Sequence, residues 1–120
     1  MIKNPEDFKN KRITIMGLGL NQGGLGVARF LAKAGTKILI TDLKTEEELG
    51  PSLKKLKGFD IKYILGLHRK KDFINTDMVI QNPAVPHNSK YLKIARKYKI
   101  PIKTDLDLFF QLCPSKNIIA

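Results

Sequence analysis

The chain has 120 residues, of which 42% are hydrophobic and 28% are charged, and its formal net charge at pH 7 is +11. This length suits one domain with its own core, and no apolar run approaches the ~18–20 residues that a membrane-spanning helix needs. Cys113 is the only cysteine, so an internal disulfide is excluded, and without a Cys/His cluster no zinc or other metal site is expected.

The first half of the chain alternates apolar runs of strand type with one helical periodicity. A buried strand is predicted over residues 12–18, where β-branched and apolar residues follow one another. Helical spacing follows from Leu25, and Gly35 ends that helix as a C-terminal glycine. A second buried strand is predicted over residues 37–42.

The segment after residue 42 contains the signals of a helix start. Thr45 is expected to be a helix N-cap, with Glu48 as its capping-box partner three residues later. The pair Gly50-Pro51 is expected to break or bend this segment before the helix resumes to Lys57. The next predicted elements are a strand, a short helical turn and a strand, at residues 60–66, 69–73 and 76–82.

The last third of the chain predicts one amphipathic helix and further short elements. Ser89 is the expected cap of the helix, whose apolar residues have the spacing i, i+3, i+4 and i+7 at Tyr91, Ile94, Ala95 and Tyr98. A short strand is predicted over residues 101–104. Thr104 is then the expected cap of a last helix.

Strands that alternate with helices predict a parallel sheet with right-handed crossovers. The fold class is therefore α/β: a Rossmann-like three-layer domain with a mainly parallel five-stranded sheet. Residues 1–11 are expected to be a lead-in, residues 12–117 the domain, and residues 118–120 the start of a strand that leads into a further domain. An apolar strand at a chain end has nothing to cover it, so we expect the functional protein to be longer.

A glycine-rich loop follows the first predicted strand. Gly17, Gly19 and Gly23 form the pattern G-x-G-x-x-x-G, and Asp42 ends the next strand nineteen residues later. This arrangement favours a bound nucleotide, because such glycines let backbone approach a phosphate and the acid can bond a ribose. It does not choose the nucleotide, although the cation Lys44 fits plain NAD less well. The alternative for Asp42 is a hydrogen bond to a nearby backbone amide.

A second candidate loop is QNPAVP, residues 81–86, after the fourth predicted strand. It lies at the same sheet edge as the glycine loop, where ligands of open α/β sheets bind. Asn82 offers amide donors and an acceptor, and Pro83 and Pro86 stiffen the loop. A plain strand-to-helix turn is an equally weighted alternative.

Four stretches in this order resemble the N-terminal domain of the Mur ligase family, with the D-glutamate-adding branch as the nearest match: GLGLNQGGLGVARFLAKAG, TDLK, DMVIQNPAVP and IKTDLDLFF. The resemblance implies that this domain holds the UDP part of UDP-N-acetylmuramoyl-L-alanine. It also implies further domains of the same chain that bind ATP, Mg²⁺ and the incoming amino acid, and a place in peptidoglycan synthesis. The substrate carboxylate is then phosphorylated and attacked by the amine of D-glutamate.

The resemblance also implies roles for particular residues. Leu20 and Asn21 occupy the loop position that faces the uridine diphosphate, Asp42 matches an acid near the uracil, and Lys44 replaces a common arginine. No catalytic residue is expected, because the chain contains no G-x-x-x-x-G-K-[S/T] phosphate loop. It should therefore hold no cofactor of its own and be inactive alone. The residues expected to bind UDP are Gly17, Gly19, Leu20, Asn21, Gln22, Gly23, Asp42, Leu43, Lys44, Asn82, Pro83 and Ala84.

Two other function classes stay open. A free-standing Rossmann module that senses NAD or a related nucleotide would show the same glycine and acid pattern. The charge of +11 raises nucleic acid as a third class, but lysines outnumber arginines 18 to 4 and are scattered along the chain. We therefore expect neither a nucleic-acid nor a membrane partner. A polar N-terminus without a secretory signal makes the cytoplasm the expected location.

Overall fold

Five parallel strands form one sheet, and the computed structural model describes residues 10–17, 22–82 and 89–104 of the chain. The strands are β1 Arg12–Met16, β2 Lys37–Asp42, β3 Ile61–Leu65, β4 Met78–Gln81 and β5 Ile102–Thr104. Their spatial order is β3-β2-β1-β4-β5, and every neighbouring pair is parallel. The predicted α/β, Rossmann-like class with a parallel five-stranded sheet is confirmed.

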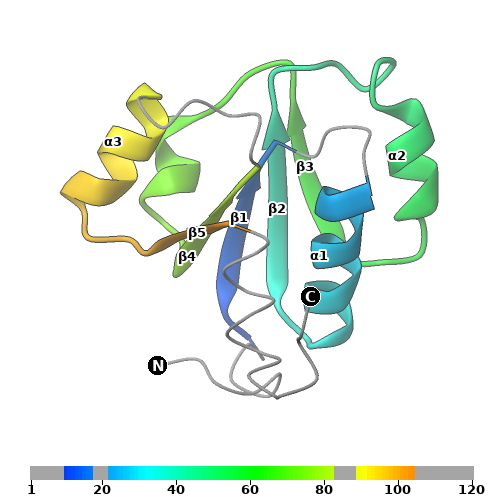
Figure 1. Ribbon diagram of the computed structural model, residues 1–120, viewed down its shortest axis with the longest axis horizontal. Coiled ribbons are helices and arrows are strands. Elements are labelled where there is room, and N and C mark those ends of the chain that lie inside the picture. Colours follow the sequence, from blue (N-terminus) through cyan, green and yellow to red (C-terminus); the bar gives the residue numbers. More distant parts are fainter. Residues whose placement is uncertain (1–9, 18–21, 83–88, 105–120) are drawn as a thin grey trace, which may run out of the picture.

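Helices cover both faces of the sheet, which gives three layers (Figure 1). The helical elements are α1 Gln22–Lys33, α2 Gly50–Lys55, the 3₁₀ turn η2 Lys70–Phe73 and α3 Lys90–Lys97. Figure 1 shows α1 and α2 on one side of the sheet and α3 on the other. The arrows of β1, β2 and β3 point to the upper edge of Figure 1, so the segments that follow these strands gather there.

The larger core lies between the sheet and the α1–α2 layer. Alternate residues of the central strands, such as Ile13 and Ile15 of β1, turn their side chains into it, as the two-residue period of a strand requires. In the register, Ile15 lies beside Ile40 of β2 and Ile80 of β4, so branched side chains meet across three strands. Ala28 and Leu31 of α1 cover them and are fully buried.

The second core lies on the opposite face, under η2 and α3. Phe73 is fully buried there beside Met16 and Val79 from the sheet and Leu92 from α3. The hydroxyl of Thr14, also buried on this face, donates to the backbone oxygen of Asp72 at 2.7 Å. The single turn η2 is therefore anchored to the central strand by both packing and a hydrogen bond.

Two predicted helix starts are wrong, each for a local reason. Helix α1 begins at Gln22 and not at Leu25, because its glycine-containing first turn carries no apolar period. Thr45 and Glu48 do make reciprocal capping-box bonds, at 3.1 Å and 3.4 Å, but they close a turn that precedes the helix. Helix α2 itself begins at Gly50, with proline in its first turn. Gly50-Pro51 therefore starts the helix, since the first turn needs no amide donor from proline.

The third helix agrees with its prediction at its cap but only in part along its apolar face, because Tyr98 is 51% exposed and the unpredicted Leu92 is fully buried. Ser89 is the N-cap of α3, and its hydroxyl oxygen accepts a bond from the amide of Tyr91 at 3.3 Å. Leu92 and Ala95 form the buried stripe. The helix predicted after Thr104 and the strand predicted at residues 118–120 lie outside the described residues.

An ion pair between Arg12 and Asp77 links the amino end of β1 to the turn before β4. The backbone amide of Arg12 donates to Asp77 Oδ2 at 2.8 Å, and the guanidinium lies 3.4 Å from the same carboxylate. That backbone hydrogen bond is the main cause that lowers the pKa of Asp77. The stabilisation is therefore present above the unfolded pKa of about 3.9 and is lost as the pH falls through the lower folded value.

Replacing Asp77 with alanine is expected to reduce the free energy of unfolding at pH 7 by about 1 kcal/mol or less, because both side chains are largely exposed to solvent. Urea unfolding at pH 7 and at about pH 3 measures this. The difference from the wild type should shrink at the lower pH. Asp60→Ala, at an exposed position before β3, is the control. An equal loss at both pH values would contradict the assignment.

Candidate functional site

The carboxyl ends of three adjacent strands gather the predicted site residues that the structure describes. Gly17 directly follows β1, Asp42 ends β2, and Asn82 directly follows β4. Strand β1 lies between β2 and β4 in the sheet, so the three positions are neighbours at one edge. The chain proceeds from β1 outward to β3 on one side and then to β4 and β5 on the other. Ligands of open α/β sheets bind at such a switch point.

Gly17 and Asn82 are joined by a hydrogen bond. Gly17 has φ 89°, in the left-handed region that favours glycine, and its amide donates to the oxygen of Thr41 at 2.8 Å. The side-chain amide nitrogen of Asn82 donates to the oxygen of Gly17 at 3.0 Å. The backbone amide of Asn82 donates to Met16 at 3.0 Å. These hydrogen bonds join the first residues of the two predicted loops. The side-chain nitrogen of Asn82 therefore bonds to the protein backbone.

Asp42 shapes the turn that follows β2. Its side chain is 8% exposed, and Oδ1 accepts a bond from the amide of Lys44 at 2.9 Å, which is an Asx turn. The alternative considered from the sequence, a bond from Asp42 to a nearby amide, is therefore present. Leu43 is 66% exposed and Lys44 is also exposed, so the turn presents both to solvent. We call residues 42–45 the β2 turn.

The other predicted residues are described in part or not at all. Gln22 and Gly23 lie in the first turn of α1, where only the backbone is described. The first amides of a helix have no partner within the helix and carry its positive dipole end. This backbone therefore presents donors toward the same edge of the sheet. The remaining predicted residues lie outside the described ranges: Gly19, Leu20, Asn21, Pro83 and Ala84.

His68 belongs to this edge and was not among the predicted residues. It follows β3, and its Nδ1 lies 2.7 Å from the hydroxyl oxygen of Thr41, the neighbour of Asp42. Burial lowers the pKa of His68, and the carboxylates of Asp42 and Asp72 oppose this shift. The ring is consequently neutral at pH 7. The sequence signal was its place two residues after the strand predicted over residues 60–66, at the edge that carries the glycine loop.

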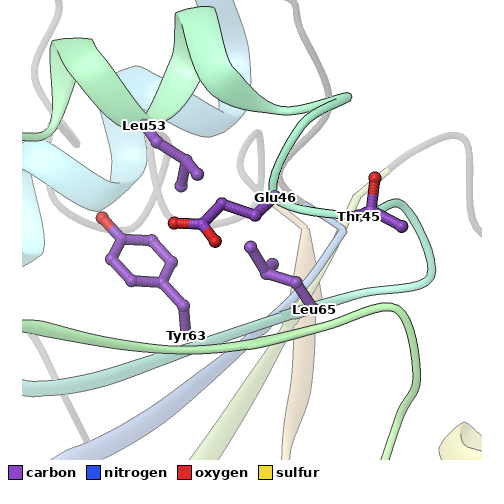
Figure 2. A pocket seen from close by; sticks show the side chains of 5 residues that line it. All are labelled: Thr45, Glu46, Leu53, Tyr63 and Leu65. Carbon is purple, nitrogen blue, oxygen red and sulfur yellow. The ribbon is translucent and has the colours of Figure 1, made fainter.

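A pocket of about 430 Å³ opens beside the β2 turn, between α2 and β3. Its walls are Leu53, Tyr63 and Leu65, and Thr45 and Glu46 of the turn complete it. Figure 2 shows the Glu46 side chain directed into this space, with its carboxylate near the ring of Tyr63. Burial raises the pKa of the Tyr63 phenol, which therefore stays protonated as a hydrogen-bond donor. The pocket thus combines apolar walls with a carboxylate and a phenol next to Lys44.

Two further findings concern the described residues alone. They bring no three His, Cys, Asp or Glu side chains together in the way that a metal ion requires. Among the described helices, none is long and apolar enough to cross a bilayer.

The sheet order and the helices on both faces define a Rossmann-like α/β domain. The fold resembles an Ael1 enzyme from Pseudomonas putida, with a TM-score of 0.56 and 11% identity over 87% of this chain and 47% of that one. It also resembles a chorismate mutase/shikimate 5-dehydrogenase fusion protein from Clostridium acetobutylicum, with a TM-score of 0.52 and 13% identity over 87% and 45%. At such identities these likenesses support the fold alone.

The sequence identifies the family. The profile of the Mur ligase MurD-like N-terminal domain matches residues 11–104, and the chain belongs to this family. A UDP-N-acetylmuramoylalanine--D-glutamate ligase of Roseiflexus sp. (strain RS-1) is 48% identical over 87% of this chain and 22% of its own length. Proteins of the same name are 49% identical in Borreliella burgdorferi (strain ZS7), over 96% and 25%, and 44% in Treponema pallidum (strain Nichols), over 90% and 21%. The chain thus spans about a quarter of these relatives, and the resemblance noted in the sequence is confirmed.

Proposed function

We propose that this chain is the UDP-N-acetylmuramoyl-L-alanine-binding domain of a cytoplasmic, ATP-dependent ligase that adds D-glutamate in peptidoglycan synthesis. The observation that carries the proposal is the 44–49% identity to D-glutamate ligases over most of the chain. The geometry supports it, because glycine backbone, a buried acid and an exposed cation meet at one sheet edge. This combination of groups suits a nucleoside diphosphate.

The chemistry of the site suits each part of that ligand. Gly17 leaves room for close approach after β1, and the amides at the start of α1 face the diphosphate with the positive end of the helix dipole. The ammonium of Lys44 pairs with a phosphate, and the Asp42 carboxylate accepts from an N–H of the uracil. We propose the same role for the predicted residues outside the described ranges: Gly19, Leu20, Asn21, Pro83 and Ala84.

Activation of the substrate carboxylate belongs to other parts of the protein in this proposal. The chain contains no phosphate loop of the G-x-x-x-x-G-K-[S/T] type, and its described residues offer no cluster of metal ligands. ATP and Mg²⁺ are therefore assigned to the full-length protein, and no step on this chain involves them. The chain holds the substrate so that the carboxylate can be phosphorylated and then attacked by the amine of D-glutamate. Its partners are this UDP-linked substrate and the other domains of its own protein.

Calorimetry with three probes tests the proposal against its rivals. We expect UDP to bind more tightly than NADH by about tenfold or more, and a short DNA duplex to give no strongly salt-dependent binding. Tighter binding of NADH would favour the alternative, a free-standing Rossmann module that senses NAD. The glycine and acid pattern is also compatible with that alternative. With ATP, Mg²⁺ and both substrates, the chain alone should release no phosphate. Substrate-dependent release would contradict the assignment of catalysis to other domains.

A further inference from the structure

The β2 turn rests on the segment that follows β3, residues 66–68. The amide of Gly66 lies 2.9 Å from the oxygens of both Asp42 and Lys44 and donates to them. Asp42 and Leu67 also form an isolated antiparallel bridge. The position of the β2 turn therefore depends on where residues 66–68 are held.

The hydrogen bonds of Thr41 determine which nitrogen of His68 carries the proton. The Thr41 hydroxyl lies 3.1 Å from the oxygen of Leu67 and 2.7 Å from Nδ1 of His68. A carbonyl oxygen only accepts, so the bond to Leu67 uses the single hydroxyl proton. The Nδ1–H tautomer of His68 is the one that keeps both bonds, because Nδ1 then donates to the hydroxyl oxygen. In this tautomer His68 links residues 66–68 to the end of β2.

The ring of His68 also contacts two aromatic residues. The centroid of Tyr91, in the first turn of α3, lies 5.1 Å away with an interplanar angle of 70°. The centroid of Phe73, at the end of η2, lies 5.9 Å away at 87°. Both are edge-to-face contacts, which favour one ring orientation. The imidazole therefore lies between β2, η2 and α3.

We propose that His68 is a positioning residue of the nucleotide site, which holds the β2 turn in place through Thr41 and the backbone of Gly66 and Leu67. This inference rests on the proposed function, because the β2 turn presents Asp42 and Lys44 to the ligand. His68 itself does not touch the ligand in this scheme. Its effect reaches the site through the hydrogen bond from Nδ1, so a residue that keeps a donor at that place should preserve binding.

The first experiment measures the ligand-free chain by NMR. In His68→Leu, which keeps bulk but has no donor, the Lys44 and Gly66 amides should exchange with solvent about tenfold faster than in the wild type. In His68→Asn, whose amide nitrogen lies near the place of Nδ1, the change should stay below about threefold. The amide of Leu53 in α2, which donates to the oxygen of the N-cap residue Leu49, is the internal control. The wild-type ¹⁵N spectrum of His68 should show a protonated Nδ1 at pH 7.5.

The second experiment measures UDP affinity by calorimetry. His68→Leu should weaken binding about 5–20-fold, and His68→Asn should stay within about threefold of the wild type. Thr41→Val, of nearly the same shape, should reproduce the loss. The double variant Thr41→Val/His68→Leu should be no weaker than Thr41→Val, because Thr41→Val alone already removes the bond to His68 together with the bond to Leu67.

The outcomes separate the two proposals. Unchanged exchange and affinity in His68→Leu, additive losses in the double variant, or an Nε2–H tautomer would overturn the role of His68. A wild-type chain that binds no UDP would overturn the proposed function. The exchange experiment needs no ligand, so it would still report whether His68 holds the β2 turn.

Discussion

Replacing Phe73 with alanine is expected to lower the free energy of unfolding by about 3–5 kcal/mol, the range for a buried phenylalanine. Phe73 is fully buried, and it fills the core between the sheet and α3. Its ring lies 5.3 Å from that of Tyr91 and also contacts His68. Its removal leaves a cavity that the anchored turn η2 cannot close. Domains of this size are stable by only about 5–15 kcal/mol, so much of the total would be lost.

Urea unfolding followed by circular dichroism measures this loss. Phe30→Ala is the matched control, because it removes the same atoms from a residue of α1 that is 39% exposed. Its expected cost is about 1–2 kcal/mol, since part of its surface is in water in both states. Phe73→Leu should lie between the two. Equal losses for Phe73→Ala and Phe30→Ala would show that the second core does not stabilise the fold as described.

Replacing Asp42 with alanine is expected to weaken the binding of UDP by about 10–100-fold, as the loss of a hydrogen bond to a charged group implies. Two effects combine in this variant. The carboxylate that we assign to the uracil is removed, and so is the acceptor that holds the amide of Lys44 at 2.9 Å. The turn that carries Leu43 and Lys44 then loses its internal hydrogen bond.

A second substitution separates these effects. Asp42→Asn keeps an oxygen that can accept from Lys44 but removes the charge, so it should preserve the turn and lose about 3–10-fold in affinity. Asp60→Ala, at the exposed start of β3 on the opposite edge of the sheet, should bind UDP like the wild type. Calorimetry measures all three. Wild-type affinity in Asp42→Ala would remove Asp42 from the proposed site.

The fold could be predicted because each strand carries its signal locally. The apolar runs at 12–18 and 37–42 locate β1 and β2 within two residues at each end, since buried parallel strands are continuously apolar. Ser89 marks the start of α3 in the same way, because its side chain caps the helix. The starts of α1 and α2 were missed because the first turn of a helix needs no apolar period and tolerates glycine and proline. Sequence periodicity therefore locates the middle of a helix better than its beginning.

The candidate site was predictable only in part, because its remaining contacts are distant in sequence. Asp42 bonds an amide two residues away, and this possibility was visible from the sequence. Thr41 and His68 are 27 positions apart and meet only because β2 and β3 are neighbours in the sheet. Asn82 and Gly17 are 65 positions apart and meet because β1 and β4 are neighbours. Such pairs cannot be predicted from a local sequence pattern, because they depend on the order of the strands in the sheet.

The bond between Asn82 and Gly17 affects how site residues are transferred between relatives. The side chain at position 82 donates to the backbone oxygen of Gly17, so it must be long enough to reach from the end of β4 to the end of β1. A shorter side chain would leave that carbonyl to water or to a ligand atom. Relatives that differ at this position could therefore bind the same molecule with a different number of solvent bridges. Comparison of hydration in such relatives would be more informative there than comparison of residue type.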